Sequence, residues 1–288
     1  MRRKTTAVRI GNVVLSSEEP VLVQSMLNTS TREVDACVEQ AIRIIEAGGR
    51  LVRITAPGVK EAEMLGEIHR RLRERGYTTP ISADIHFVAE AASVAARYVE
   101  KVRINPGNFA DKRATFKKLT YTDEEYAAEL EILRQKFTEF LEVCRQYGTA
   151  VRIGTNHGSL SDRIMSRYGD TPAGMVEATM EYLRVCQACD FKDVVISLKS
   201  SDCRTMVDAV RLLVEKMEAE GMCYPLHLGV TEAGEGEDGR IRSAVGIGTL
   251  LNEGIGDTIR VSLTEEPEAE IPVACELARG CFARKGEV

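Results

Sequence analysis

Tryptophan is missing from this sequence, and the other aromatic residues are few. Aromatic residues make up 5% of the 288 residues. Long apolar runs are missing too, since none reaches the roughly 20 residues that a membrane-spanning helix needs. The basic start, Met1-Arg2-Arg3-Lys4, has no apolar stretch behind it, so we find no signal peptide. These absences disfavour a membrane or secreted protein and favour a cytoplasmic one.

A basic excess is absent as well. Lys and Arg number 38 against 44 Asp and Glu, which gives a net charge of -6. Because nucleic-acid binders usually carry a basic face, the composition disfavours such a partner. The eight cysteines are irregularly spaced, unlike a disulfide framework. Cys186 and Cys189 have no second pair of this spacing, so we interpret them as packing residues and expect no metal site in this chain.

The sequence does contain a regular alternation of strand and helix patterns. Parallel strands need crossover connections of this kind. The predicted strands are residues 21–26, 51–55, 80–86, 101–105, a segment beginning at 151, 193–199, 224–231 and 257–263. Residues 6–15 precede them as a short hairpin around Gly11-Asn12. The pattern predicts an α/β fold, a closed TIM (β/α)8 barrel with an N-terminal β-hairpin, as one domain over residues 1–288.

The alternative fold is an open doubly wound sheet. No dinucleotide-type glycine fingerprint opens the first predicted helix, which favours the barrel. One long helix is marked clearly, because Thr122 and Glu125 form a capping box and Gly148 is a suitable stop. The last helix is predicted for residues 267–282.

A four-residue phrase, apolar-Arg-apolar-polar, recurs at four predicted strand ends. Its copies are Val52-Arg53-Ile54-Thr55, Val102-Arg103-Ile104-Asn105, Val151-Arg152-Ile153-Gly154 and Ile259-Arg260-Val261-Ser262. Alternate residues of a strand share a face, so the β-branched residues would face the helices and the arginines the barrel interior. A further copy, Val8-Arg9-Ile10, lies in the hairpin and has no crossover helix behind it, so it is left out of the site.

The same parity places other charged residues near the arginines. Asp84 and His86 share a face of one strand, Lys199 ends another, and Glu232 follows a third. The predicted cations of the barrel mouth are Arg53, Arg103, Arg152, Lys199 and Arg260. Guanidinium groups match phosphate oxygens bidentately, and unpaired buried charges are costly, so the pattern predicts a small enclosed anion. The alternative is internal pairing with carboxylates, which Asp84 and Glu232 are too few to complete.

Three further interpretations stay open from the residues alone. Lys199 is also suited to form a Schiff base in a barrel lyase on a phosphorylated carbonyl substrate. A pterin-binding synthase shares the barrel, although the arginine density argues against it. His157, in a glycine-containing loop, fits a site residue and a structural residue equally well.

Five blocks in order along nearly the whole chain carry a family resemblance. They are Val21-Leu22-Val23-Gln24-Ser25-Met26, Ala83-Asp84-Ile85-His86-Phe87, Val102-Arg103-Ile104-Asn105-Pro106-Gly107-Asn108, Val151-Arg152-Ile153-Gly154-Thr155-Asn156-His157-Gly158-Ser159 and Gly254-Ile255-Gly256-Asp257-Thr258-Ile259-Arg260-Val261-Ser262. The chain resembles the 4-hydroxy-3-methylbut-2-enyl diphosphate synthases of the non-mevalonate isoprenoid pathway.

The resemblance implies a TIM barrel followed by a C-terminal domain that holds a [4Fe–4S] cluster. Members of the family reductively open 2-C-methyl-D-erythritol 2,4-cyclodiphosphate to the linear allylic diphosphate, with electrons from flavodoxin or ferredoxin. They are often homodimers, so a homodimer stays open for this chain. The family's cluster ligands lie beyond Val288, so we expect this chain to bind substrate without turning it over and to rely on its own C-terminal cluster domain.

The resemblance also assigns roles to residues of this chain. Diphosphate binding falls to Arg53, Arg103, Arg152, Lys199 and Arg260, with hydrogen bonds from Asn105, Asn156 and Ser262. Orientation of the carbon skeleton, and proton supply, fall to Asp84, His86 and Glu232.

Overall fold

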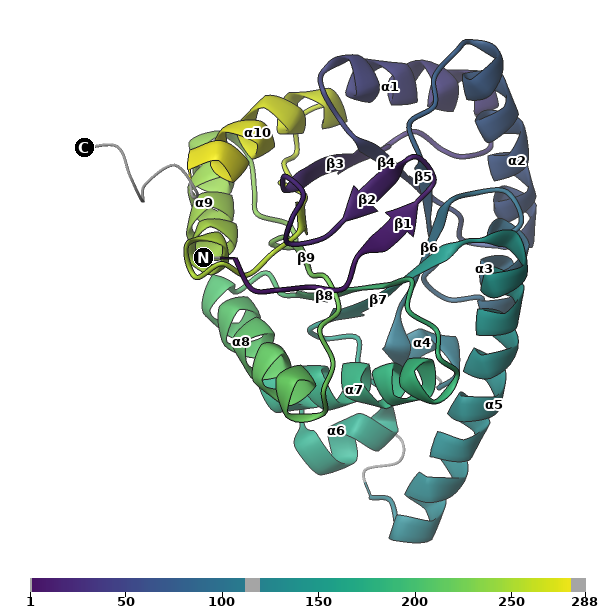
Figure 1. Cartoon of the computed structure of the whole chain (residues 1–288), viewed down its shortest axis with the longest axis vertical. Coiled ribbons are helices and arrows are strands. Elements are labelled where there is room, and N and C mark those ends of the chain that lie inside the picture. The colour runs from purple at the N-terminus through teal and green to yellow at the C-terminus, as the bar shows by residue number, and fades with distance from the viewer. Residues whose placement is uncertain (1, 112–119, 281–288) are drawn as a thin grey trace.

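The computed structural model describes residues 2–111 and 120–280, and within them eight parallel strands form one sheet (Figure 1). The strand order is β8-β7-β6-β5-β4-β3-β10-β9. The strands are β3 (Leu22–Met26), β4 (Leu51–Thr55), β5 (Ile81–Asp84), β6 (Lys101–Ile104), β7 (Ala150–Asn156), β8 (Val194–Lys199), β9 (His227–Leu228) and β10 (Thr258–Ile259). A parallel bridge from Ile196 to Leu226 joins the two ends of this order, so the sheet closes into the predicted barrel.

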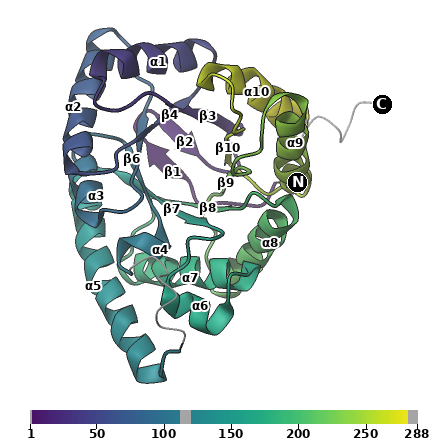
Figure 2. The same ribbon diagram turned by 180° about the vertical axis from the view of Figure 1, so that it is seen from behind.

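Helices surround the barrel, as Figures 1 and 2 show from opposite ends. Those that follow successive strands are α1 (Val34–Glu46), α2 (Val59–Glu74), α3 (Ala89–Ala95), α5 (Asp123–Tyr147), α7 (Pro172–Ala188), α8 (Cys203–Ala219), α9 (Gly236–Asn252) and α10 (Glu270–Gly280). Two short helices, α4 (Pro106–Phe109) and α6 (Asp162–Tyr168), and a 3-10 turn, η1 (Pro267–Ala269), were not predicted separately. The capping box of Thr122 with Glu125 and the left-handed Gly148 confirm the predicted limits of α5.

The predicted N-terminal hairpin is present and closes one end of the barrel. Strands β1 (Val8–Ile10) and β2 (Val13–Leu15) pair antiparallel. Their apolar side chains form a cluster with four buried residues of the barrel strands, Leu22, Leu51, Ala150 and Val195. Figure 1 shows the hairpin lying across the barrel on the near side. The N-terminal end of the barrel is therefore plugged with apolar side chains, and any ligand must enter from the other end.

Some predicted boundaries were wrong. Strands β9 and β10 each have two residues instead of the longer runs expected. Pro225 has no N–H to extend the ladder before β9, and Gly256, with φ +124°, turns the chain just before β10. The sequence pattern predicts a short helix over residues 243–252, but helix α9 already begins at Gly236. The end of the last predicted helix, residues 281–282, lies outside the described residues.

The β-branched residues of the recurring phrase face outward, as predicted. Val52, Ile54, Val102 and Ile104 are at most 1% exposed and belong to the core between sheet and helices. The intervening arginines therefore face inward. Across residues 2–111 and 120–280, no helix is both long enough and apolar enough to cross a membrane.

Candidate functional site

Two successive layers of side chains line the barrel interior above the hairpin plug. Alternation along each strand places inward residues two apart. We call the layer nearer the plug the inner tier; it comprises Gln24, Arg53, Ser82, Lys101, Arg152, Ser197, His227 and Thr258. The next layer is the outer tier; it comprises Met26, Thr55, Asp84, Arg103, Gly154, Lys199, Gly229 and Arg260. Six of these residues are cations, one more than the sequence predicted, because Lys101 shares the parity of Arg103.

Asp84 lies between two of the predicted arginines. Its carboxylate is 2.9 Å from Nη1 of Arg103 and 3.1 Å from Nε of Arg53, and all three side chains are buried. Burial alone would raise the pKa of Asp84, but Arg103 and Arg53 outweigh it and lower the pKa far below its ordinary value. Asp84 is therefore ionised and fixes both guanidinium groups.

Glycine makes room for two of the cations. A Cβ on Gly154 would lie 2.5 Å from Nε of Arg103, and a Cβ on Gly229 would lie 2.8 Å from Nζ of Lys199. Arg103 also donates from Nη2 to the Gly154 carbonyl at 2.8 Å. The final residue of the phrase Val151-Arg152-Ile153-Gly154 is thus small because a long side chain from the neighbouring strand occupies its place.

Arg260 is held by a carboxylate that sequence reasoning missed. Glu270, on α10, accepts from Nε of Arg260 at 3.1 Å and from Nη2 at 3.0 Å. The Ser25 hydroxyl donates to the same carboxylate at 2.6 Å, and the Leu263 N–H at 3.1 Å. No sequence spacing links α10 to the end of β10, so only the folded arrangement reveals this partner.

The remaining three cations form no ion pair with a carboxylate of the described residues. They are Lys101, Arg152 and Lys199, which are 0%, 2% and 8% exposed. Burial and the neighbouring arginines lower the pKa of each well below its ordinary value. Asp84 and Glu270 are the carboxylates that pair with the cluster, so positive charge remains in excess.

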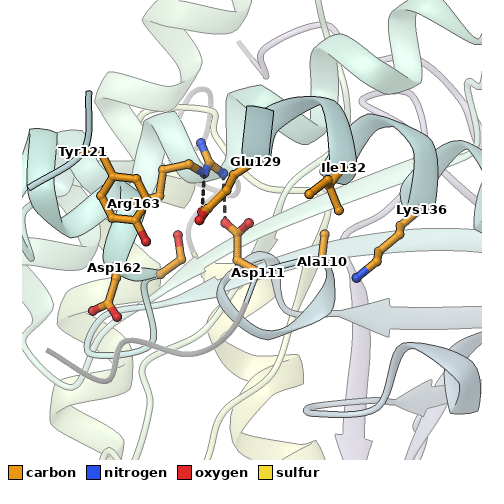
Figure 3. A pocket seen from close by; sticks show the side chains of 9 residues that line it. Ala110, Asp111, Tyr121, Glu129, Ile132, Lys136, Asp162 and Arg163 are labelled. Atoms are coloured by element: carbon orange, nitrogen blue, oxygen red, sulfur yellow. Dashed lines mark hydrogen bonds and ion pairs between the residues drawn. The ribbon is translucent and has the colours of Figure 1, made fainter. Parts of the chain in front are cut away.

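Arg163 shows what a buried arginine with structural partners looks like in the same molecule. It is 1% exposed, and its nitrogens lie 2.7 Å from Glu181, 2.8 Å from Asp111 and 3.9 Å from Glu129. Figure 3 shows it beside Asp111 and Glu129 on the wall of a pocket of about 350 Å³. Burial alone would lower the pKa of Arg163, but Glu181 and Asp111 raise it above its ordinary value. Arg152 differs from Arg163 because no carboxylate of the described residues pairs with it and its pKa is lowered. This is expected of a residue that binds an anionic ligand.

His86 and Asp84 lie together as predicted, although β5 ends at Asp84 and His86 stands in the loop behind it. Nε2 of His86 is 3.8 Å from Asp84 Oδ1, and the side chain is 32% exposed. Burial lowers the pKa of His86, Asp84 opposes this, and Arg103 and Arg53 lower it further. The imidazole is therefore neutral at pH 7 in the ligand-free barrel.

The other predicted site residues are less closely joined to the cluster. Asn105 is buried and its side chain accepts from the Gly107 N–H at 3.3 Å, so it caps α4. Asn156, the cross-strand partner of Lys199, and Ser262 are half-buried. Glu232 is exposed, with φ +51°, and makes no ion pair with the cluster. His157, left open above, lies 3.4 Å from Asp170.

The described residues contain no group of three His, Cys, Asp or Glu side chains suited to hold a metal ion. The seven cysteines among them form no disulfide. Cys186 is buried within α7, which agrees with a packing role.

Comparison with protein-family models identifies the family of this barrel. The model of the GcpE TIM-barrel domain matches residues 5–275. The chain belongs to this family. A relative from Parabacteroides distasonis, named 4-hydroxy-3-methylbut-2-en-1-yl diphosphate synthase (flavodoxin), is 64% identical over 96% of this chain and 45% of its own length. The Arabidopsis thaliana chloroplastic enzyme of that name (ferredoxin) is 53% identical over 96% of this chain and 38% of its own.

The GcpE-type barrel thus spans less than half the length of these relatives. A solved Yersinia pestis dihydropteroate synthase resembles it with a TM-score of 0.62 and 12% identity, covering 97% of this chain and 100% of that one. A solved N-acetylneuraminic acid synthetase from Leptospira borgpetersenii resembles it with a TM-score of 0.61 and 10% identity, covering 100% of this chain and 94% of that one. At such identities the likeness concerns the barrel fold alone.

Proposed function

We propose that this barrel binds 2-C-methyl-D-erythritol 2,4-cyclodiphosphate and positions it for reductive ring opening to 4-hydroxy-3-methylbut-2-enyl diphosphate. The observation that carries the proposal is the excess of cations in one enclosed space. Six buried or nearly buried cationic side chains face two paired carboxylates. A diphosphate is a compact polyanion whose oxygens accept from guanidinium and ammonium groups.

Each tier has a part in this proposal. Arg103 and Arg260 are already aimed by Asp84 and Glu270, so they meet the diphosphate with little loss of side-chain freedom. The diphosphate ligands are Arg53, Arg103, Arg152, Lys199 and Arg260, with hydrogen bonds completed by Asn105, Asn156 and Ser262. His86 and Glu232, at the rim, orient the hydroxyl groups and carbon skeleton beside Asp84.

The neutral state of His86 has a consequence within this proposal. Burial lowers its pKa, and three arginines lower it further against the opposing charge of Asp84. A bound diphosphate offsets their charge, so the pKa of His86 rises and the imidazole takes up a proton. His86 would then stand at the rim as a charged donor toward the substrate oxygens.

The family resemblance and the relatives' names point to electrons from flavodoxin or ferredoxin through a [4Fe–4S] cluster. The described residues do not fit such a cluster, because they bring no set of metal-ligating side chains together. The part that we propose for the described residues in this reaction is therefore binding and orientation.

Calorimetric titration with the cyclodiphosphate tests the proposal. We expect saturable binding of one ligand per chain and a raised melting temperature. The same titration with Arg53→Met should show at least tenfold weaker binding. Absence of both heat and thermal shift would overturn the proposal.

A second candidate function rests on Lys199. Its pKa is lowered well below its ordinary value by burial and by Arg53, which favours a neutral, nucleophilic amine. As a lyase, the barrel would form an imine between Nζ and a phosphorylated carbonyl substrate, with release of water. Borohydride in the presence of such a substrate would reduce the imine to a stable adduct. A mass increase at Lys199 would support the lyase, and an unchanged mass would support the diphosphate site.

A further inference from the structure

Buried polar atoms without partners gather in the inner tier. Those without a hydrogen-bond partner include Nζ of Lys101, Nε and Nη1 of Arg152, Nη1 of Arg53 and Nε2 of His227. The outer tier contributes Nε of Arg103 to the same group. An unpaired buried donor is costly, and an unpaired buried cation more so. The imbalance is therefore greatest in the layer directly above the hairpin plug.

The hydrogen bonds of Gln24 determine which ring nitrogen of His227 carries the proton. The Thr258 hydroxyl donates to the Leu22 carbonyl at 2.8 Å, so it accepts from Nε2 of Gln24 at 2.7 Å. That nitrogen lies 2.9 Å from Nδ1 of His227, which therefore accepts. Burial and Lys199 lower the pKa of His227 well below 6.5, so the ring is neutral with its proton on Nε2. His227 thus presents one free N–H donor.

The free groups of the inner tier are mostly donors. Lys101, Arg152 and His227 come from three different strands, β6, β7 and β9, and each is at most 2% exposed. Lys101 and Arg152 are close enough to His227 to lower its pKa. Below them lies the apolar cluster of the hairpin. Buried donors from three strands, next to a layer of apolar groups, favour one compact anion that accepts hydrogen bonds from all of them.

We propose that Lys101, Arg152 and His227 form an inner anion site that takes a small inorganic oxyanion such as phosphate. It lies one tier below the outer-tier groups Arg103, Lys199 and Arg260, which with Arg53 and Arg152 are the ligands that we propose for the cyclodiphosphate. Its occupation does not require the organic substrate. Arg152 is shared, since it borders both tiers.

Phosphate titration of three lysine variants tests the inner site. We expect Lys101→Met to weaken inorganic phosphate binding at least tenfold and Lys199→Met less than threefold. Lys216→Met, on the exposed face of α8, is the matched control and should leave binding unchanged. Lys101→Met removes an unpaired buried cation, so the variant should fold and should have a higher melting temperature than the wild-type chain. Phosphate binding that is absent from the wild-type chain, or depends on Lys199 and not on Lys101, would overturn the proposal.

Titration of the same variants with cyclodiphosphate separates this proposal from the proposed function. Cyclodiphosphate affinity should fall in Lys199→Met and should change less than threefold in Lys101→Met. If the wild-type chain binds phosphate in a Lys101-dependent way but does not bind cyclodiphosphate, the proposed function is refuted and the inner anion site stands.

A selenate soak of wild-type crystals tests the site without any variant. We expect an anomalous peak within hydrogen-bond distance of Nζ of Lys101 and Nε2 of His227. Ordered water alone at that position would refute the inner site.

Discussion

Arg103 and Arg152 are direct cross-strand partners on β6 and β7, and both side chains are buried. Like charges directly opposite one another destabilise a sheet. Asp84 forms an ion pair with Arg103 at 2.9 Å, but no carboxylate of the described residues pairs with Arg152. The barrel therefore maintains an electrostatic cost that a bound anion would relieve. Such a cost is expected where binding, and not stability, determines the residues.

Replacement of Arg152 should separate stability from binding. Arg152→Met removes an unpaired buried cation and keeps much of its volume, so the empty chain should become more stable by about 1–3 kcal/mol. Cyclodiphosphate affinity should fall at least tenfold, because a charge-assisted contact is lost. Urea unfolding and calorimetry measure the two effects. A variant that is less stable than wild type would contradict an unpaired Arg152.

Arg163→Met is the matched control for that experiment. Arg163 is equally buried but pairs with Glu181 and Asp111. Its removal leaves buried carboxylates without partners and should destabilise the chain by about 3–5 kcal/mol. Phosphate and cyclodiphosphate affinities should be unchanged in the fraction that remains folded.

The stability of the empty chain should rise with pH. The pKa values of Lys101 and Lys199 are lowered from 10.5 in the folded chain. Between the lowered pKa and 10.5, the unfolded chain binds more protons than the folded one, so the free energy of unfolding increases with pH. Urea unfolding from about pH 7 to about pH 7.7 measures this slope, below the ordinary thiol pKa of about 8.5.

Lys101→Met should flatten that slope, and saturating phosphate should flatten it too by restoring the proton on the lysine. A free energy of unfolding that falls over the same pH range in the empty wild-type chain would be inconsistent with lowered lysine pKa values.

Gly229→Ala should weaken diphosphate binding through Lys199. The new Cβ would lie 2.8 Å from Nζ of Lys199 and 3.0 Å from the Arg260 carbonyl oxygen. The flexible lysine must move away, and affinity should fall about tenfold, the size of one charged hydrogen bond. Gly280→Ala, where the Cβ meets nothing within 4 Å, is the control. Equal affinities for the two variants would show that the position of Lys199 does not matter.

Strand parity accounts for how much of the site could be predicted. The period of two is fixed by backbone geometry, so the inward direction of Arg53, Arg103 and Arg152 followed from the β-branched residues between them. Lys101 has the same parity as Arg103 and was overlooked because it stands before the phrase. The signal was present in the sequence.

Other features depend on contacts that sequence spacing does not encode. Glu270 reaches Arg260 because α10 packs beside β3, and Gln24 on β3 contacts His227 on β9 across the intervening strand β10. Strands β9 and β10 have strongly strand-like sequences, yet Pro225 and Gly256 limit their ladders. Glu232 follows a strand as predicted, but its left-handed backbone and exposure leave it away from the cluster.

A crystal structure of the chain with cyclodiphosphate tests the central claim most directly. We predict both phosphorus atoms inside the barrel, with phosphate oxygens within hydrogen-bond distance of the guanidinium groups of Arg53, Arg103 and Arg152. A diphosphate bound outside the barrel, or a lumen in which these arginines contact only protein and water at saturating ligand, would contradict it.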